Sequence, residues 1–398
     1  MKTRNHKVVL VAVIVGLFMV GIAGPATAQK PPESIILSGY EVGTSTYSQI
    51  QAVGNAINAQ YGTAVRTLPF GDAVGRLLAT KLGRAQFASS ATDWYLAFEG
   101  LYDFSTLAWG PQALELVWHT QPTALVTMAT TKKSGIKTPY DAKGKRVAQI
   151  AGSPALNLAI RSWLAFGNLT LNDVKVVNFS GYTQSISGLI NGTADVTFGF
   201  GTTPQYHDLD ASPQGLVWVA LPFADAAGWS RMLAVAPHLQ HFTASSSDAA
   251  VGVTAANPVQ GASFVSPVIV SYTGAVPDDI AYFYVKAIDE LYPKYKDSFQ
   301  VMKYWTLKDS LHPQGYAPYH PGVVKYLKEK GIWNAQFQKF QDGMLKRRQI
   351  LQTAWDKTVS EGTHKGLTSA QLQETWLKNR QAALDAQQPQ HPSSWWQP

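Results

Sequence analysis

Short apolar runs alternate with longer stretches of helical period in the segment that begins at residue 34. Ile35–Leu37 predicts a buried strand, Tyr47–Asn58 a helix and Ala64–Leu68 a second strand. A helix over Ala73–Leu82 and a third strand that begins at Gln86–Ala88 follow. Because strands that alternate with helices at this spacing pair in parallel, the pattern predicts a mainly parallel α/β sheet.

The same alternation restarts near residue 141. It predicts strands over Val147–Ile150, Val174–Asn178 and Asp195–Phe200. Between them, Ala155–Phe166 and Thr183–Ile190 have the pattern of helices. The chain therefore predicts a second α/β unit that repeats the organisation of the first.

The rest of the chain has a less regular pattern. Residues 210–265 give no clear assignment, whereas Val265–Tyr272 predicts a strand and Val276–Tyr292 a helix. Beyond Asn334 the pattern is helical and rich in Lys, Gln and Ala. We expect the helix around Met344–Asp356 to pack on the first unit; a dimer contact or a contact with a membrane partner is the alternative.

The turns after the predicted strands are small and polar, and ligands of such sheets bind beyond the carboxyl ends of the strands. Gly43–Thr46 precedes a helix, so its N–H groups and the helix dipole favour a carboxylate. Gly152–Pro154, with Asn157 one turn on, repeats this arrangement in the second unit. We expect the two turns to close on one anion, unless they are ordinary helix caps.

The candidate ligand-binding residues lie in these turns or beside them. They are Gly43, Thr44, Ser45, Thr46, Tyr47, Gly71, Asp72, Ser90, Asp93, Gly152, Ser153, Asn157, Thr202, Thr203, Gln205 and Trp229. Tyr47 either contacts the ligand or packs between the units. Asp72 and Asp93 either select an amine or hydroxyl donor or cap helices. Arg231, close to Trp229, either recognises a carboxylate or lies at the surface.

The first 28 residues have the composition of a secretory signal peptide. Lys2, Arg4 and Lys7 precede an apolar run over Val8–Ala23, and small residues at Ala26 and Ala28 form a cleavage site. The run of about 16 residues is shorter than the roughly 20 that a spanning helix needs, so an uncleaved anchor is the weaker alternative. We expect cleavage after Ala28 and a mature protein in a bacterial periplasm that does not span the membrane.

Length, charge and cysteine content narrow the class of protein. Removing 28 residues from 398 leaves 370, a length natural for two domains. The absence of cysteine excludes disulfides and a lipid-bearing cysteine. The formal charge of +7 falls to +4 when the three cations of the signal are removed. Its densest cluster, Lys346–Arg348, is expected to be a solvated helix face, so we expect no nucleic-acid partner. The mild positive balance of the whole chain suits a small organic anion as ligand.

Catalytic motifs are lacking in the sequence. The chain has no cysteine nucleophile and no G-x-S-x-G motif. His238 and His241 have no third metal ligand nearby and are expected in a surface loop. Gly199–Gly201 lacks the lysine of a phosphate-binding loop. We therefore expect a protein that is not an enzyme and needs no cofactor or metal.

Five stretches resemble one family of proteins. Residues 71–77 run into 82–87, and Ser134–Thr138 leads into Lys143–Val147. Near the end of the match comes Tyr319–Gly331, with the sequence YHPGVVKYLKEKG. Together these resemble the TAXI family of solute-binding proteins, the extracytoplasmic receptors of TRAP transporters.

The resemblance covers roughly residues 34–333 and implies a type II periplasmic-binding-protein fold. Such a fold has two α/β lobes, a ligand cleft and two hinge strands; a C-terminal helical extension would follow it here. The resemblance also implies a TRAP permease as membrane partner. The division of the chain that we expect is 1–28 signal peptide, 29–130 and 267–333 lobe one, 131–266 lobe two, 334–386 helical extension and 387–398 disordered tail, with Leu125–Ala129 and Val268–Tyr272 as hinge strands.

One departure from the family affects the ligand. The first turn, Gly39–Tyr47, carries more side chains than the glycine-dense turn of the family, so a glutamate-like ligand does not follow. Two other functions stay open. One is a receptor for an ABC importer of the nitrate or sulfonate kind, and the other is a periplasmic sensor or scaffold that presents its C-terminal helices to a partner.

Overall fold

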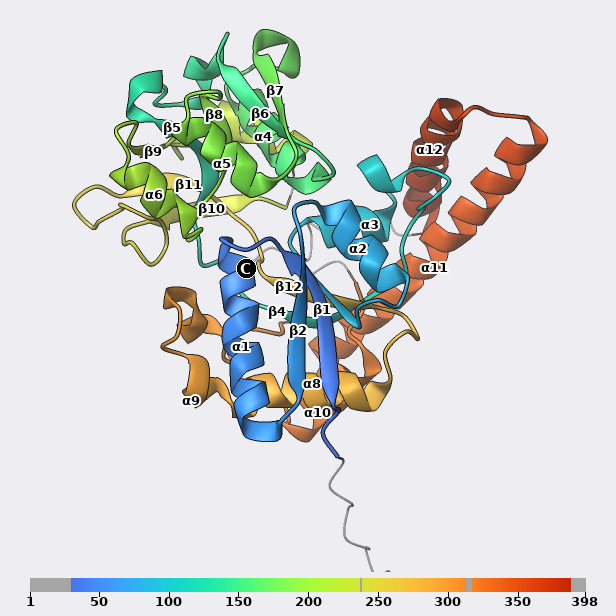
Figure 1. Cartoon of the computed structure of the whole chain (residues 1–398). Coiled ribbons are helices and arrows are strands. Elements are labelled where there is room, and N and C mark those ends of the chain that lie inside the picture. The colour runs from blue at the N-terminus through green and yellow to red at the C-terminus, as the bar shows by residue number, and fades with distance from the viewer. Residues whose placement is uncertain (1–29, 237, 313–316, 388–398) are drawn as a thin grey trace, which may run out of the picture. The chain divides into compact units, whose positions relative to one another are not determined.

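The computed structural model describes residues 30–236, 238–312 and 317–387 (Figure 1). The predicted signal peptide and residues 388–398 of the predicted tail lie outside the described residues. The elements below belong to the compact unit that begins at Pro32. Among the described residues, no helix combines the length and apolar character needed to cross a bilayer.

The first sheet has five strands in the order β2-β1-β3-β12-β4. Strand β1 (Ser34–Tyr40) runs parallel to β2 (Ala64–Phe70) and β3 (Phe87–Ser90). Strand β12 (Val268–Tyr272) lies antiparallel between β3 and β4 (Leu114–His119). The carboxyl ends of β1 to β3 therefore meet at one edge, as the sequence predicted.

The first two helices cover opposite faces of this sheet. The Ser38 hydroxyl of β1 donates to the Arg76 carbonyl of α2 (2.8 Å). Gly54 of α1 lies against Val65, where an added Cβ would be 3.0 Å from Cγ1. Val65 pairs with Ile35, which faces away from Ser38 because successive strand residues alternate sides. The helices on this sheet are α1 (Ser45–Tyr61), α2 (Ala73–Lys81), α8 (Asp278–Glu290), α9 (Tyr292–Tyr295) and α10 (Pro321–Glu329).

The second sheet has the order β10-β11-β5-β8-β6-β7, with β9 paired to β5. Its strands are β5 (Val126–Thr131), β6 (Arg146–Ile150), β7 (Lys175–Phe179), β8 (Val196–Phe200), β9 (Leu216–Trp218), β10 (Gln240–Ala244) and β11 (Val259–Ser263). The helices of this part are α4 (Pro154–Phe166), α5 (Tyr182–Ile190), α6 (Gln205–Ala211) and α7 (Ala226–Val235). The region that the sequence left unassigned thus holds α7 and three strands.

The chain passes between the sheets twice, from β4 to β5 and from β11 to β12. Strand β12 lies inside the first sheet beside β3, and β5 lies inside the second sheet beside β8. Each sheet therefore contains one interior strand that the chain enters directly after it leaves the other sheet. This exchange of strands between two α/β lobes is the type II periplasmic-binding-protein fold. The described residues also include five short 3₁₀ turns: η1 (Tyr102–Phe104), η2 (Lys132–Ser134), η3 (Pro139–Ala142), η4 (Leu171–Asp173) and η5 (Gln300–Tyr304).

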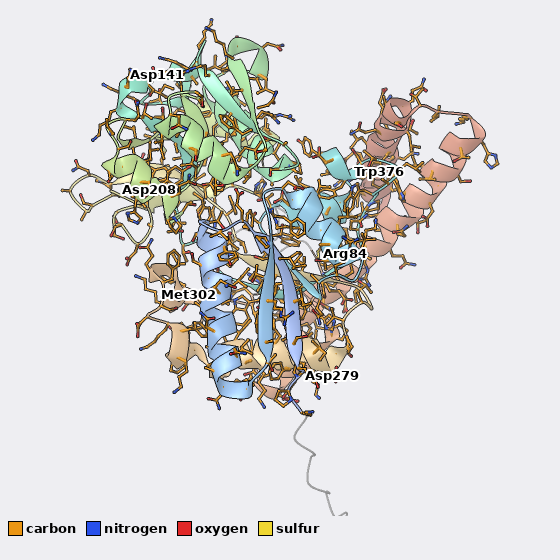
Figure 2. All side chains as sticks on the ribbon, viewed as in Figure 1. Arg84, Asp141, Asp208, Asp279, Met302 and Trp376 are labelled. Atoms are coloured by element: carbon orange, nitrogen blue, oxygen red, sulfur yellow. The ribbon has the colours of Figure 1, made fainter. Side chains whose placement is uncertain are left out.

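A helical hairpin extends the first lobe. Helices α11 (Ala335–His364) and α12 (Ser369–Gln387) run side by side (Figure 1). They hold α3 (Asp93–Glu99), all seven residues of which are buried. The Trp376 indole, labelled in Figure 2, donates to the Gly100 carbonyl at the end of α3 (2.6 Å). The hairpin is therefore part of the packed core.

A buried ion cluster fixes the hairpin to α3. Glu99 is fully buried and accepts from Arg347 Nε (2.6 Å) and Arg347 Nη2 (2.9 Å). Arg380 of α12 donates to the same carboxylate and to the Glu99 carbonyl. The prediction that Lys346–Arg348 forms a solvated face is wrong for Arg347, because a helix of this length buries one side against α3.

Candidate functional site

A pocket with about 340 Å³ of empty space lies where strands of the two sheets end. Tyr40 ends β1 on one side, and Phe200 ends β8 on the other. Both lobes and the crossing segment before β12 supply its walls. The lining residues are Tyr40, Thr44, Ser45, Thr46, Ala91, Leu156, Tyr182, Phe198, Phe200, Thr203, Phe264 and Ser266.

The first turn of α1 forms the polar part of this pocket. Thr44 is the N-cap, and its hydroxyl accepts from the Tyr47 N–H (3.3 Å). The first turn of α1 carries no acidic residue. Because the first N–H groups of a helix have no partner within it, this turn offers donors and a positive dipole end to an anion.

Aromatic rings form the opposite wall. Burial raises the pKa of Tyr182 to about 12, so its phenol is neutral. Its oxygen accepts from the Phe200 N–H (3.3 Å) and lies 3.3 Å from the Thr203 hydroxyl. Phe200 and Phe264 lie with ring centroids 6.0 Å apart. The described residues that line the pocket include no Asp, Glu, Lys, Arg or His.

A buried ion pair lies directly behind Tyr40. The Arg76 guanidinium is 3.7 Å from the centre of the Tyr40 ring and 3.2 Å from Asp93 Oδ2. Burial raises the pKa of the Tyr40 phenol and of the Asp93 carboxyl, and the Arg76 charge opposes both shifts. The charges of the ion pair therefore balance each other behind a neutral wall.

Asp93 also reaches the second lobe. Its Oδ1 accepts from the Ala155 N–H at the start of α4 (3.0 Å). Ser153, the N-cap of α4, makes no side-chain cap bond. The prediction that this turn and the first turn close on one bound anion does not fit this arrangement, because a carboxylate of the first lobe already occupies the α4 N-terminus.

Glu41 makes an equivalent contact with α5. Its Oε1 accepts from the Thr183 N–H in the first turn of α5 (2.6 Å). Gly71 and Gly181 leave room for this side chain, since an added Cβ at either would lie 3.2 Å from Glu41 Oε2. Helices α4 and α5 of the second lobe thus each receive a carboxylate from the first lobe.

Two further contacts join the lobes beside the pocket. The Gly152 carbonyl accepts from the N–H groups of Ala73 (2.8 Å) and Val74 (3.3 Å) at the start of α2. Gly152 has φ +61, and a Cβ there would lie 2.7 Å from the Asp72 Cβ, so this approach requires glycine. Asp72 itself caps α2 through Gly75 N–H (2.6 Å), as the cap alternative predicted.

Several predicted residues gather at the pocket. Thr44, Ser45, Thr46 and Thr203 line it. Thr202 lies next to it, with its hydroxyl 2.8 Å from the Ser45 hydroxyl of the opposite lobe.

Other predicted residues have structural contacts. Asn157 bonds to the backbone of Ile150 at both ends of its amide (2.9 and 2.7 Å). Gln205 Nε2 donates to the Thr183 carbonyl (3.2 Å) and so joins α6 to α5. Ser90 is buried, and its hydroxyl has no hydrogen-bond partner within the described part of the chain. Tyr47 is half-buried and is absent from the pocket wall, as is Gly43.

The structure places Trp229 and Arg231 away from the pocket wall. The Trp229 indole donates to the Pro222 carbonyl (3.1 Å) and packs against Phe166 of α4. Arg231 Nε donates to the Ala165 carbonyl (2.9 Å). These side chains fix α7 to α4, and Arg231 supplies a donor to a carbonyl in the last turn of α4 that has no partner within its helix.

The histidine pair is not as predicted either. His238 is buried beside Phe264, and burial lowers its pKa to about 4. The expected surface loop therefore holds one buried, neutral imidazole. Within the residues that the structure covers, no three His, Cys, Asp or Glu side chains are grouped to hold a metal.

The sequence interpretation missed the apolar wall. Tyr40, Tyr182, Phe198, Phe200 and Phe264 each lie at or near the end of a strand or the start of a helix. Their position directly beside the polar turns was the available signal. The sequence prediction considered mainly the polar residues of these turns and so did not include the aromatic ones.

The fold and the pocket define a two-lobed α/β binding protein. A family model described as the NMT1-like family matches residues 42–331, and the chain belongs to this family. The family comprises substrate-binding proteins, which confirms the expectation that the chain is not an enzyme. None of the curated proteins compared with the chain matches it.

The chain is also similar to solved structures. The alkanesulfonate-binding protein SsuA from Xanthomonas axonopodis pv. citri, bound to MOPS, is 14% identical, with 89% of this chain and 92% of that chain covered and a TM-score of 0.40. The periplasmic binding protein BugD is 12% identical, with 79% and 98% covered and a TM-score of 0.46. An ancestral arginine-binding protein bound to arginine is 14% identical, with 67% and 98% covered and a TM-score of 0.41.

Proposed function

We propose that this protein is a periplasmic receptor that captures a small carboxylate-bearing solute between its two lobes. The observation that carries the proposal is a pocket walled by both lobes at the ends of their strands. A solute in that pocket contacts both lobes at once, and such contacts favour the closed arrangement. Export by the predicted signal peptide, residues 1–28, is part of the proposal.

The lining supports a solute with one carboxylate and an apolar body. The first turn of α1, at Thr44–Thr46, is the donor surface available for the carboxylate. The N-termini of α4 and α5 already receive Asp93 and Glu41, so a second acidic group on the solute would gain little there. Aromatic rings make up most of the remaining wall. Because the wall is largely aromatic, it favours a solute with an aromatic body, for which benzoate is the simplest probe.

We further propose that the receptor delivers its solute to a TRAP-type permease. The resemblance of residues 71–77, 134–147 and 319–331 to the TAXI family supports this partner. The division into lobes at residues 130/131 and 266/267 belongs to the same proposal. Uptake into vesicles that contain the permease subunits should then need the receptor but no ATP. A requirement for ATP would indicate an ABC importer.

Thermal-shift and calorimetric titrations of the mature chain, from Gln29 onward, test the ligand class. Benzoate, propionate, glutamate, ethanesulfonate and benzyl alcohol separate the carboxylate from the apolar body. At a hundredfold excess over Kd, a ligand stabilises the folded chain by about 2.7 kcal/mol. We expect benzoate to stabilise most. Greater stabilisation by glutamate or ethanesulfonate than by benzoate would contradict the ligand class. No stabilisation by any compound of the panel would contradict the receptor function.

A matched pair of variants locates the binding. Phe200→Ala removes an aromatic ring from the pocket and should weaken benzoate binding at least tenfold. Phe223→Ala removes a half-buried ring that packs on Trp229 outside the pocket, and should leave the affinity unchanged. Equal affinities in the two variants would place the solute elsewhere.

A further inference from the structure

A second pocket lies on another side of α4. It has about 890 Å³ of empty space and shares no lining residue with the pocket beside Tyr40. Three parts of the chain form it: the η1 segment of the first lobe, the β6–α4 turn of the second lobe, and α12 of the hairpin. Its polar side chains include Tyr102, Asp103, Gln149, Asn157, Arg161 and Gln373.

Arg161 brings an uncommitted positive charge to this pocket. It lies one turn after Asn157 on the same side of α4, whereas Leu156 faces the first pocket. Its Nε is buried and has no hydrogen-bond partner in the described part of the chain. Within those residues no carboxylate lies within ion-pair distance of it. The guanidinium thus keeps its donors for a group that enters the pocket.

Asp103 brings the opposite charge from the other lobe. It lies in η1, and no ion pair to it is formed within the described residues. Partial burial raises the pKa of its carboxyl, and the Arg161 charge acts in the opposite direction. The two charges therefore interact electrostatically across the pocket. Gln373 of α12 fixes the η1 segment through Ser105 Oγ (2.5 Å). The hairpin therefore helps to position Asp103.

We propose that this pocket is a second ligand site, for a small zwitterion whose carboxylate binds Arg161 and whose ammonium group binds Asp103. A molecule with both charges satisfies both side chains at once, and a molecule with one charge leaves the other side chain unpaired. A planar guanidinium is suited to bidentate contact with a carboxylate. Because the two charges belong to different lobes, the zwitterion bridges the lobes beside the first pocket.

Calorimetry on the full mature chain at low ionic strength tests this site. The probes are glycine, β-alanine, 4-aminobutyrate and 6-aminohexanoate, which differ in the separation of their charges, with acetate and methylammonium as singly charged comparisons. We expect one zwitterion to bind at least tenfold more tightly than either comparison. No binding by any zwitterion, or acetate binding as tightly as the best zwitterion, would overturn the proposal.

Variants assign the binding to the pocket. Arg161→Gln and Asp103→Asn should each weaken the binding of the zwitterion at least tenfold. Arg84→Gln and Asp208→Asn are matched controls at exposed positions outside the pocket, both labelled in Figure 2, and should bind as the parent does. Circular dichroism checks that each variant is folded. Unchanged affinity in both pocket variants would show that the zwitterion binds elsewhere, whatever the outcome for benzoate in the first pocket.

Discussion

Glu41 and Asp93 are the side chains by which the first lobe reaches the helices of the second. Each carboxylate accepts from an N–H in the first turn of a helix, α5 or α4. A negative charge at such a place stabilises by about 0.3–1 kcal/mol, and by up to about 2 kcal/mol when partly buried. The two contacts therefore help to hold the lobes together through protein atoms alone.

Replacing Glu41 with glutamine tests this contact. Glu41→Gln keeps the shape of the side chain and removes its charge. The arrangement in which the lobes are joined should therefore be destabilised by about 1 kcal/mol relative to an arrangement with the lobes apart, which lowers the ratio of their populations about fivefold. Small-angle X-ray scattering should show a larger radius of gyration. Glu33→Gln, at an exposed position nearby in the chain, is the control and should match the parent. An unchanged radius for Glu41→Gln would mean that the other contacts suffice.

These partners could not be predicted from the sequence. The polarity of the turns is a local property, and it singled out Thr44–Thr46 and Thr203, which line the pocket in the structure. Glu41 and Thr183 are 142 positions apart, and their contact depends on how two separate sheets meet. A helix cap that comes from another lobe leaves no local signal.

Helix α3 is the element that links the pocket to the hairpin. Its first residue, Asp93, contacts α4 and Arg76, and its last residue, Glu99, contacts α11 and α12. Burial opposes ionisation of Glu99, but the charges of Arg380 and Arg347 outweigh burial and hold its pKa below the ordinary value. One short helix thus joins two buried ionic clusters.

Removal of the Glu99 charge should destabilise the chain strongly. Glu99→Gln leaves two guanidinium groups without their carboxylate, and breaking a buried ion pair in this way costs about 3–5 kcal/mol. Urea denaturation measures the loss in the free energy of unfolding. Glu374→Gln, on the exposed side of α12, serves as the comparison and should unfold as the parent does.

The difference in stability between the parent chain and Glu99→Gln should depend on pH. Because the pKa of Glu99 in the folded chain lies below its ordinary value of 4.5, the unfolded chain binds more protons between the two values. The stability that Glu99 contributes is therefore present above about pH 4.5 and is lost as the pH falls through the folded pKa. The difference in unfolding free energy between the parent and Glu99→Gln should shrink below that pH. A constant difference would contradict the low pKa.

At the scale of elements, the sequence predicted most of the strands and helices, and it predicted that the helix around Met344–Asp356 packs on the first unit, but it did not predict that α11 does so through a buried arginine. Its apolar positions are spread loosely, since part of the buried side is Arg347 rather than an apolar residue. Hydrophobic periodicity cannot detect a face that is buried by ionic contacts. Likewise, β9 and β11 are short strands that pair with β5, β10 is a short strand that pairs with β11, and the local pattern of all three is weak.

At the scale of the whole molecule, the exchange of β5 and β12 between the sheets joins two lobes, each built on its own sheet, around a shared pocket. The alternation of strands and helices predicted the two units, because it is a property of each unit alone. The size of the pocket and its neutral wall depend on the final approach of the lobes. That approach is set by the contacts of Glu41, Asp93 and Gly152.

The bridging contacts have a consequence for the kinetics of capture. If protein atoms hold the lobes together, a solute can enter only during the intervals when those contacts break. In stopped-flow fluorescence, the observed rate should rise with solute concentration and then level off at the rate of opening. Glu41→Gln should raise this plateau, and a rate that stays linear in concentration would show that entry is not gated. Departure of the solute meets the same gate, so residence time reports on the lobe contacts as well as on affinity.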